Sequence, residues 1–215
     1  MPFRKSPLAT GHVYHIFNKS IAGFKIFNTD TDYNRLIQSM LYYNSNKNFC
    51  GLTRFKELGN TISFSMQKTA QLVEIIAFCH MPTHFHLILK QLKENGISCF
   101  MNALQKSYSQ FFNRKQDRKG PLWQGPFKNK LVDKDEYLIH LTRYIHLNPV
   151  KARIANTPKD WPYSSFNEYI GKVDKEHKIC EYENILNITS SYEQYVNDHI
   201  DYQRSLSKIN HLIIE

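Results

Sequence analysis

The sequence predicts an α+β fold in which an antiparallel sheet carries helices on one face. Three features support this prediction: short apolar runs typical of strands, longer segments with apolar residues at helical spacing, and their order along the chain. That order is strand, helix, strand pair, helix, strand, helix. The 215 residues suffice for one domain with a core, or for one domain and a tail.

The N-terminal part of the chain is expected to supply three strands and one helix. Residues 11–20 alternate enough to form the first strand. A helix follows within FNTDTDYNRLIQSMLYYN, where Thr or Asp side chains at residues 29–32 suit its N-terminal cap. Residues 45–68 are expected to form a loop with at most a weak strand. Residues 72–78 and 85–89 are predicted strands on either side of a Met-Pro turn.

Two further helices are expected after the strand pair. Residues 94–115 place apolar side chains on one helical stripe that should face the core. The members of this stripe are Ile97, Phe100, Met101, Leu104, Tyr108 and Phe111. Residues 128–152 then predict a short strand and a helix, which Asp133 or Asp135 would cap and Pro149 would end.

The composition changes at about residue 171, where the chain becomes polar with a sparse apolar stripe. This change predicts one domain over residues 1–170 and a helical C-terminal extension over residues 171–215. We expect the extension to dock on the domain or to mediate an interaction, because no chemically active motif is visible in it.

The charge balance favours a polyanionic partner, of which nucleic acid is the commonest. The chain has 28 Lys and Arg against 19 Asp and Glu, a formal net charge of +9. A Gly- and Pro-interrupted segment at residues 113–130 concentrates cations around two aromatic residues, as in segments that follow a nucleic-acid backbone. A merely solvated charged run is the alternative. The candidate DNA-binding residues are Arg114, Lys115, Arg118, Lys119, Trp123, Lys128 and Lys130.

The cysteines give no sign of a metal or redox centre. Cys50, Cys79, Cys99 and Cys180 lack the spacing of such motifs, and no signal peptide or membrane-spanning run is visible. Free thiols in a cytoplasmic protein are therefore expected.

The most informative stretch is FCHMPTHFHLIL, which contains two histidines one residue apart. On a strand His84 and His86 point the same way, and about 7 Å separates them, close enough to converge on one cation. The spacing alone favours two ordinary histidines on a half-solvated sheet face, so a third ligand must come from elsewhere in the chain.

A second pair lies on the last predicted helix. Tyr144 and Asn148 are four residues apart and share one face. If this face approaches the histidines, the Asn148 amide oxygen can complete a mixed N/O site suited to Mg²⁺ or Mn²⁺. Tyr144 is then a candidate nucleophile toward phosphorus, although a core tyrosine is the alternative in a chain with 13 tyrosines.

Five motifs occur in order over residues 11–171: VYHIFNKS, MPTHFHLIL, SQFFNRKQDRKGPLWQGPFK, DEYLIHLTRYIHLNPVKA and WPYSSFNEY. With them the chain resembles the HUH-type single-tyrosine transposases of bacterial insertion sequences, especially the REP-associated tyrosine transposases. The resemblance implies a ferredoxin-like sheet with the tyrosine helix beside it. It also implies metal ligands His84, His86 and Asn148, with Tyr144 as the nucleophile.

The implied activity is metal-dependent cleavage and rejoining of single-stranded or hairpin DNA through a 5′-phosphotyrosine, by a monomer or homodimer. Two positions depart from the family pattern: Thr83 replaces a common Asn, and Pro126 replaces a common Arg. A catalytically silent DNA-binding protein of the same fold is the main alternative. An unrelated H-x-H enzyme is the other, and Ile88 stands where a histidine-triad hydrolase needs a third histidine.

Overall fold

The structure, a computed structural model, describes residues 7–45, 50–60, 71–183 and 191–200. Its centre is a four-stranded antiparallel sheet in the order β2-β3-β1-β4. The strands are β1 (Val13–Lys19), β2 (Val73–Met81), β3 (His84–Gln91) and β4 (Lys128–Val132). Helices α1 (Asp30–Tyr43) and α3 (Gly96–Lys115) complete a βαββαβ order. The predicted α+β class and the ferredoxin-like sheet are confirmed.

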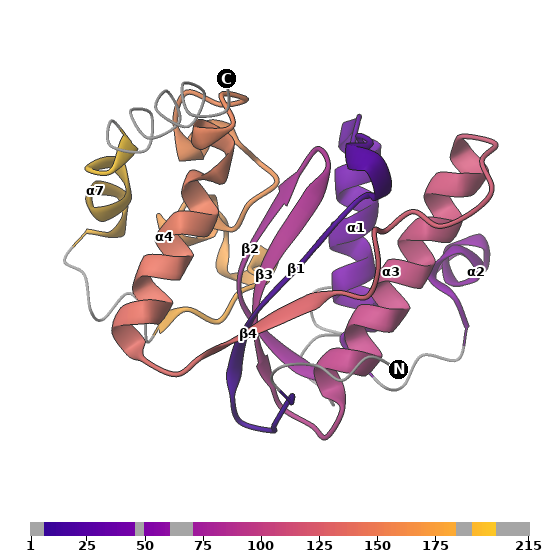
Figure 1. Ribbon diagram of the computed structural model, residues 1–215, viewed down its shortest axis with the longest axis horizontal. Coiled ribbons are helices and arrows are strands. Elements are labelled where there is room, and N and C mark those ends of the chain that lie inside the picture. The colour runs from indigo at the N-terminus through magenta and orange to yellow at the C-terminus, as the bar shows by residue number, and fades with distance from the viewer. Residues whose placement is uncertain (1–6, 46–49, 61–70, 184–190, 201–215) are drawn as a thin grey trace.

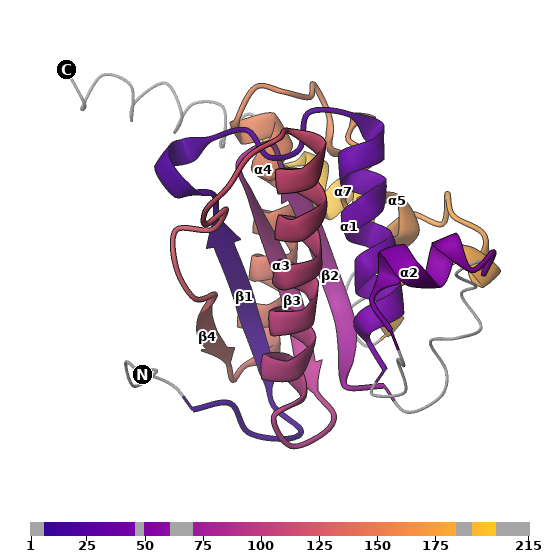
Figure 2. The same cartoon turned by 90° about the vertical axis from the view of Figure 1, so that its right-hand side faces the viewer.

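The helices cover both faces of the sheet, which corrects the expectation of one covered face. α1 and α3 pack together on one face, whereas α4 (Asp135–Lys151) lies across the other, mainly against β2 (Figure 1). Figure 2 looks onto the α1–α3 face with α4 behind the sheet. The physical reason is visible in β2, VEIIAFCHM, which is buried at nearly every position rather than at alternate ones. A strand that is apolar on both sides requires cover on both sides.

A short helix, α2 (Leu52–Glu57), lies where a loop was expected. Leu52 is fully buried, its amide donates to the Tyr43 hydroxyl at 3.0 Å, and Phe55 packs on Tyr42. Six residues are too few to show a helical period in the sequence, so contacts with α1 decide this element. Residues 46–49 and 61–68 of the expected loop lie outside the described residues.

The start of α1 is as predicted, and the stripe of α3 needs one change. Thr29 and Asp32 form the reciprocal hydrogen bonds of a capping box. In α3, Phe112 is buried, whereas Phe111 is half-buried and lies beneath the Arg35 guanidinium at 5.4 Å. A ring at the edge of the stripe thus packs on the core with one part and against a guanidinium with the other.

Helix α4 differs from prediction at both ends. Its N-cap is Lys134 in an extended conformation, so neither Asp133 nor Asp135 caps it with a side chain; Asp135 is its first residue. Pro149 lies inside the helix, which continues to Lys151. A proline near a C-terminus removes one hydrogen bond, and the following amides still find partners: Ala152 donates to the Asn148 carbonyl at 2.9 Å.

The described part of the C-terminal extension packs on the sheet and on α4. Tyr182 and Cys180 are buried near α5 (Phe166–Tyr169), and Tyr192 and Val196 of α7 (Tyr192–Asn197) join the same core. Three 3-10 turns, Ile21–Gly23, Pro158–Asp160 and Lys175–His177, complete the described elements. No helix in the described ranges has the length and apolar character needed to cross a membrane.

Candidate active site

The strand register gathers the two histidines on the α4 face of the sheet. His84 and His86 of β3 lie opposite Lys19 and Phe17 of β1, respectively. Side chains of directly paired residues point to the same face, so all four project toward α4. The intervening Phe85 is fully buried toward α3, where it meets Trp123. The rings of His84 and His86 lie edge to face with centroids 5.1 Å apart.

The Nδ1 atom of each of the two histidines makes a hydrogen bond. The Nδ1 atom of His84 lies 3.0 Å from the Thr83 hydroxyl, and the Nδ1 atom of His86 lies 2.9 Å from Nε2 of His15. No hydrogen bond of the described residues involves either Nε2 atom. This arrangement suits metal coordination, because ligating histidines use one nitrogen and anchor the other. Thr83, a departure from the family pattern, therefore fills an anchoring position.

Electrostatics keep these imidazoles neutral. Burial, then the neighbouring His15 and His84, lowers the pKa of His86 well below its usual value. Burial, with Lys19 as the second cause, lowers the pKa of His84. Burial and Lys130 lower the pKa of His15 to about 4. Neutral imidazole is the form that binds a metal ion.

Tyr144 of α4 lies beside His86. Their ring centroids are 6.0 Å apart at an interplanar angle of 81°. The side chain remains accessible, with 38% of the residue exposed, and the Lys151 ammonium lies 5.7 Å from its ring centroid. Partial burial raises the pKa of the Tyr144 phenol, so a nearby cation is needed to favour its ionised form.

Asn148 lies one turn beyond Tyr144 and is 7% exposed. Along α4, Tyr137 lies by Lys130, level with His15, and Tyr144 lies by His86, nearer the β2–β3 turn. The next turn of the helix, which carries Asn148, therefore continues in the direction of the β2–β3 turn. The Asn148 Nδ2 atom is buried without a partner among the described residues. Because amide oxygen and nitrogen are assigned rather than observed, this orphaned position equally fits a ligating oxygen.

The donors therefore fit a divalent ion held by two imidazoles and an amide. The described residues contain no cluster of three or more His, Cys, Asp or Glu side chains that could hold a metal. An ion at this place would depend on His84, His86 and Asn148, with further positions open to water or phosphate oxygens. Open positions are what a catalytic ion requires, in contrast to a closed structural site.

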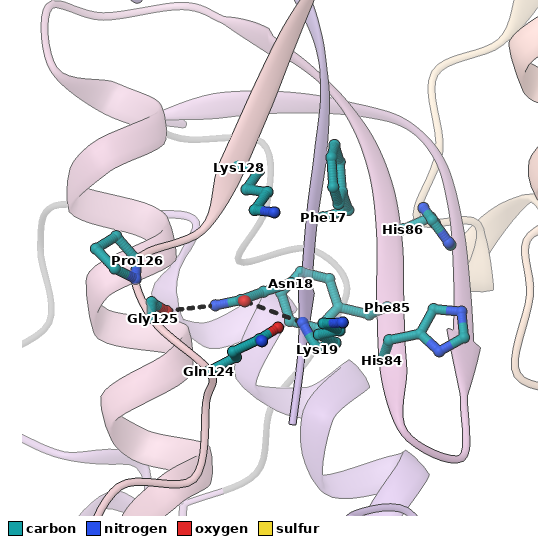
Figure 3. Close-up of a pocket in the computed structure, with 10 residues that line it drawn as sticks. All are labelled: Phe17, Asn18, Lys19, His84, Phe85, His86, Gln124, Gly125, Pro126 and Lys128. Carbon is teal, nitrogen blue, oxygen red and sulfur yellow. Dashed lines mark hydrogen bonds between the residues drawn. The ribbon is translucent and has the colours of Figure 1, made fainter. Parts of the chain in front are cut away.

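A groove of about 520 Å³ opens beside the histidines (Figure 3). The loop after α3 forms the opposite wall of the groove and is hydrogen-bonded to β1. The Asn18 side-chain amide donates to the Gly125 carbonyl at 2.9 Å, and the Gln124 main-chain N–H donates to the Lys19 carbonyl at 3.0 Å. Pro126, the second departure from the family pattern, lines this wall without a charge. The groove is lined by Phe17, Asn18, Lys19, His84, Phe85, His86, Gln124, Gly125, Pro126 and Lys128.

The predicted DNA-binding cations fall into two groups. Lys128 and Lys130 lie on the site face, where Lys130 stacks over the Tyr137 ring at 4.9 Å. The other four lie at or just beyond the end of α3. Of these, Lys115 pairs with the buried Asp32 at 2.7 Å and Arg118 caps its own loop through Asn113 and Pro121. Arg114 and Lys119 have no ion pair within the described part of the chain.

Trp123 is placed for packing. Its indole donates to the Gln105 carbonyl at 3.2 Å and its ring meets Phe85 edge to face at 5.3 Å. The half-buried ring thus anchors the basic loop to α3. A base-stacking role for Trp123 remains a prediction, for which its exposed edge is available.

Four residues of the site were missed in the sequence: His15, Phe17, Lys19 and Lys151. The first three alternate along β1, in the VYHIFNKS motif. Their common face was readable from that alternation, but its proximity to the histidine strand was not. Lys151 is seven residues after Tyr144, two helical turns away on the same side of α4.

A ferredoxin-like sheet with paired histidines on a central strand, faced by a helix that bears a tyrosine, is the arrangement that the resemblance to HUH-type single-tyrosine transposases implied. The family described as "Transposase IS200 like" matches residues 52–148, which include both histidines, Tyr144 and Asn148.

The chain is also similar to one relative in sequence and to one solved structure in fold. The chain is 37% identical over 105 residues to a REP-associated tyrosine transposase of Haemophilus influenzae, a match that spans 44% of this chain and 59% of that relative. A solved structure of a REP-associated tyrosine transposase bound to a REP hairpin superposes with a TM-score of 0.56 at 16% identity, covering 89% of this chain and 97% of the other. These matches confirm the resemblance to REP-associated tyrosine transposases, and the structural match confirms the fold.

Proposed function

We propose that this protein cleaves and rejoins single-stranded DNA through a covalent bond to Tyr144. The observation that carries the proposal is the accessible Tyr144 phenol beside His86, next to imidazole nitrogens that are free to bind an ion. Tyrosine is a nucleophile that forms covalent intermediates, and it requires activation because its phenol is protonated at neutral pH.

The groove supplies the place for the DNA strand. Lys19 and Lys128 flank it and can contact phosphates, while Phe17 offers an aromatic ring to an unpaired base. Duplex DNA stacks its bases internally, so an aromatic ring in the groove favours an unpaired segment. The solved relative is bound to a REP hairpin, and we propose a hairpin with an unpaired flank as the DNA of this chain.

The chemical step is a transesterification at one phosphodiester. The Tyr144 Oη atom attacks phosphorus and loses its proton to solvent; the bond from phosphorus to O3′ breaks, and that oxygen leaves with the electron pair and gains a proton. The products are a 5′-phosphotyrosine and a free 3′-OH. Attack by another 3′-OH reverses the bond changes and reseals the strand without an external energy source.

The residues that would hold a divalent ion, Mg²⁺ or Mn²⁺, are His84, His86 and Asn148. When bound, the ion supplies positive charge next to the phosphoryl oxygens and the phenol. Lys151 adds a second positive charge close to the Tyr144 ring.

A test incubates the full chain and Mn²⁺ with hairpin oligonucleotides that carry single-stranded flanks. We expect a covalent DNA adduct that survives denaturation, with the DNA on the peptide that contains Tyr144. Tight hairpin binding without any adduct or cleavage would support the silent DNA-binding alternative, and no binding would overturn both.

A further inference from the structure

The side chain of His15 makes a buried contact that the proposed chemistry does not use directly. His15 lies in the middle of β1, is 8% exposed, and pairs across the sheet with Ile88 of β3 and Lys130 of β4. Its Nε2 atom lies 2.9 Å from Nδ1 of His86, and the two rings are stacked with centroids 5.1 Å apart at 23°. The contact joins residues 71 positions apart in the sequence.

We propose that His15 is a positioning residue that selects the tautomer of His86 and aims its Nε2 lone pair toward the proposed cation site. The inference rests on the proposed function, because it assigns His15 to an ion held by His84 and His86. In this arrangement the His86 Nδ1–H group donates to the Nε2 lone pair of His15. The remaining nitrogen of His86 then carries no proton and is available as a ligand.

The tautomer matters because a neutral imidazole has one donor and one acceptor nitrogen. If His15 donated instead, Nδ1 of His86 would be the acceptor and Nε2 would carry the proton, which blocks coordination. Only one direction of the 2.9 Å hydrogen bond is therefore compatible with an ion at His86. Metal-binding histidines generally have such a partner, which fixes both tautomer and ring orientation.

The surroundings of His15 hold it against His86 and are compatible with the proposed direction. Phe17 packs on the His15 ring from the same strand, with centroids 4.9 Å apart, and holds the ring against His86. His84 shows a parallel arrangement, since its Nδ1 atom contacts the Thr83 hydroxyl at 3.0 Å. A hydroxyl can accept as well as donate, so both histidines can present Nε2 without a proton. Two neighbouring imidazoles anchored through the same nitrogen indicate a common coordination geometry.

The test compares two substitutions in the full chain. His15→Gln retains a side-chain oxygen that can accept from His86, whereas His15→Leu removes the acceptor and keeps a similar volume. The exposed His12, outside the site, provides the control His12→Leu. Two measurements are made on each protein: Mn²⁺ affinity by titration calorimetry, and the protonated nitrogen of His86 by long-range ¹H–¹⁵N NMR without metal. Unfolding by urea shows whether each variant is folded.

The wild-type chain is expected to carry the His86 proton on Nδ1. His15→Leu should weaken Mn²⁺ binding by about 10- to 100-fold and move the proton to Nε2, whereas His15→Gln should stay within about threefold of the wild type. A merely structural role for His15 would alter stability without changing the tautomer.

Two results would overturn the inference: a wild-type His86 protonated on Nε2, or a folded His15→Leu chain that binds Mn²⁺ as the wild type does. If His15→Leu does not fold, the wild-type tautomer and the Gln variant still decide. Wild-type protein that binds Mn²⁺ with the expected tautomer but forms no DNA adduct leaves the inference standing and overturns the proposed function. Absence of Mn²⁺ binding by the wild type overturns the inference itself.

Discussion

The Tyr144 ring of α4 stands nearly perpendicular to the His86 ring of β3, at 81° with centroids 6.0 Å apart, so the tyrosine lies next to the histidine strand. This relationship joins a helix and a strand whose side chains are 58 positions apart in the sequence. It converts two separate motifs into one arrangement in which an ion and a nucleophile can meet at the same phosphate.

Tyr144→Phe should abolish adduct formation, with cleavage falling by at least about a thousandfold. The change removes one oxygen and leaves the ring packing, so DNA binding and Mn²⁺ affinity should stay near wild type. Denaturing electrophoresis of labelled hairpin DNA provides the measurement. Tyr137→Phe is the matched control, because Tyr137 lies on the same helix about 10 Å from Tyr144 along its axis. Adduct formation by Tyr144→Phe would exclude the assignment.

His84→Ala and His86→Ala should each remove Mn²⁺-dependent cleavage, with Mn²⁺ affinity lower by more than about 100-fold. Asn148→Ala should be milder, since two imidazoles and water can still hold an ion. Calorimetric titration with Mn²⁺ measures the affinities. His140→Ala offers a control on the exposed side of α4, where His140 contacts Arg143. Wild-type cleavage by His84→Ala would contradict the metal site.

Substituting Lys19 and Lys128 with Gln should weaken binding of the unpaired strand and reduce its salt dependence. Each lost phosphate contact lowers the slope of log affinity against log salt by about 0.7 for single-stranded DNA. Fluorescence anisotropy at several salt concentrations measures the slope. Lys106→Gln, a change at an exposed residue of α3, shows the effect of losing one positive charge outside the groove. A slope equal to that of the wild type would show that the groove does not contact phosphates.

Arg114 and Lys119, the two cations without an ion pair at or just beyond the end of α3, allow a second test of salt-dependent DNA binding. Arg114→Gln with Lys119→Gln should lower the salt slope on hairpin DNA if the stem lies there, whereas stability should hardly change. Lys115 is left intact in this variant because its pair with the buried Asp32 stabilises the fold. If only the binding of unpaired DNA weakens, the stem lies elsewhere.

His80→Leu should make the free energy of unfolding less sensitive to a fall in pH. His80 is fully buried, neither ring nitrogen has a hydrogen-bond partner among the described residues, and burial lowers its pKa to about 3. The unfolded chain takes up a proton below about pH 6.5, whereas the folded chain does not, so the unfolding free energy falls as the pH drops. The loss is about 1.4 kcal/mol per pH unit for this one histidine.

Urea unfolding of the wild type and His80→Leu at pH 7 and pH 5 measures the difference. The wild type should lose more stability on acidification by roughly 2 kcal/mol. Equal losses in the two proteins would show that His80 takes up its proton in the folded state. His12→Leu, which removes an exposed histidine, serves as the control.

Local periodicity was sufficient to predict which side chains of the candidate site share a face. His84 and His86 share a strand face, and Tyr144 and Asn148 share a helix face, because the spacing within a strand or helix follows from the backbone alone. The strand pair, the start of α1 and the core stripe of α3 were predictable for the same reason. Short α2 and the passage of α4 through Pro149 were not, since packing against neighbours outweighs local preference there.

By itself the sequence determined the four strands and the helices α1, α3 and α4, their order, and the residue types available for metal binding and nucleophilic attack. Only the tertiary structure decided that helices cover both faces of the sheet and that α4 packs on β2 with Tyr144 beside His86. It also decided that His15 of β1 contacts His86 and that Trp123 packs on α3. The physical reason is that strand pairing and helix packing join residues far apart in the chain, and no local period carries this information.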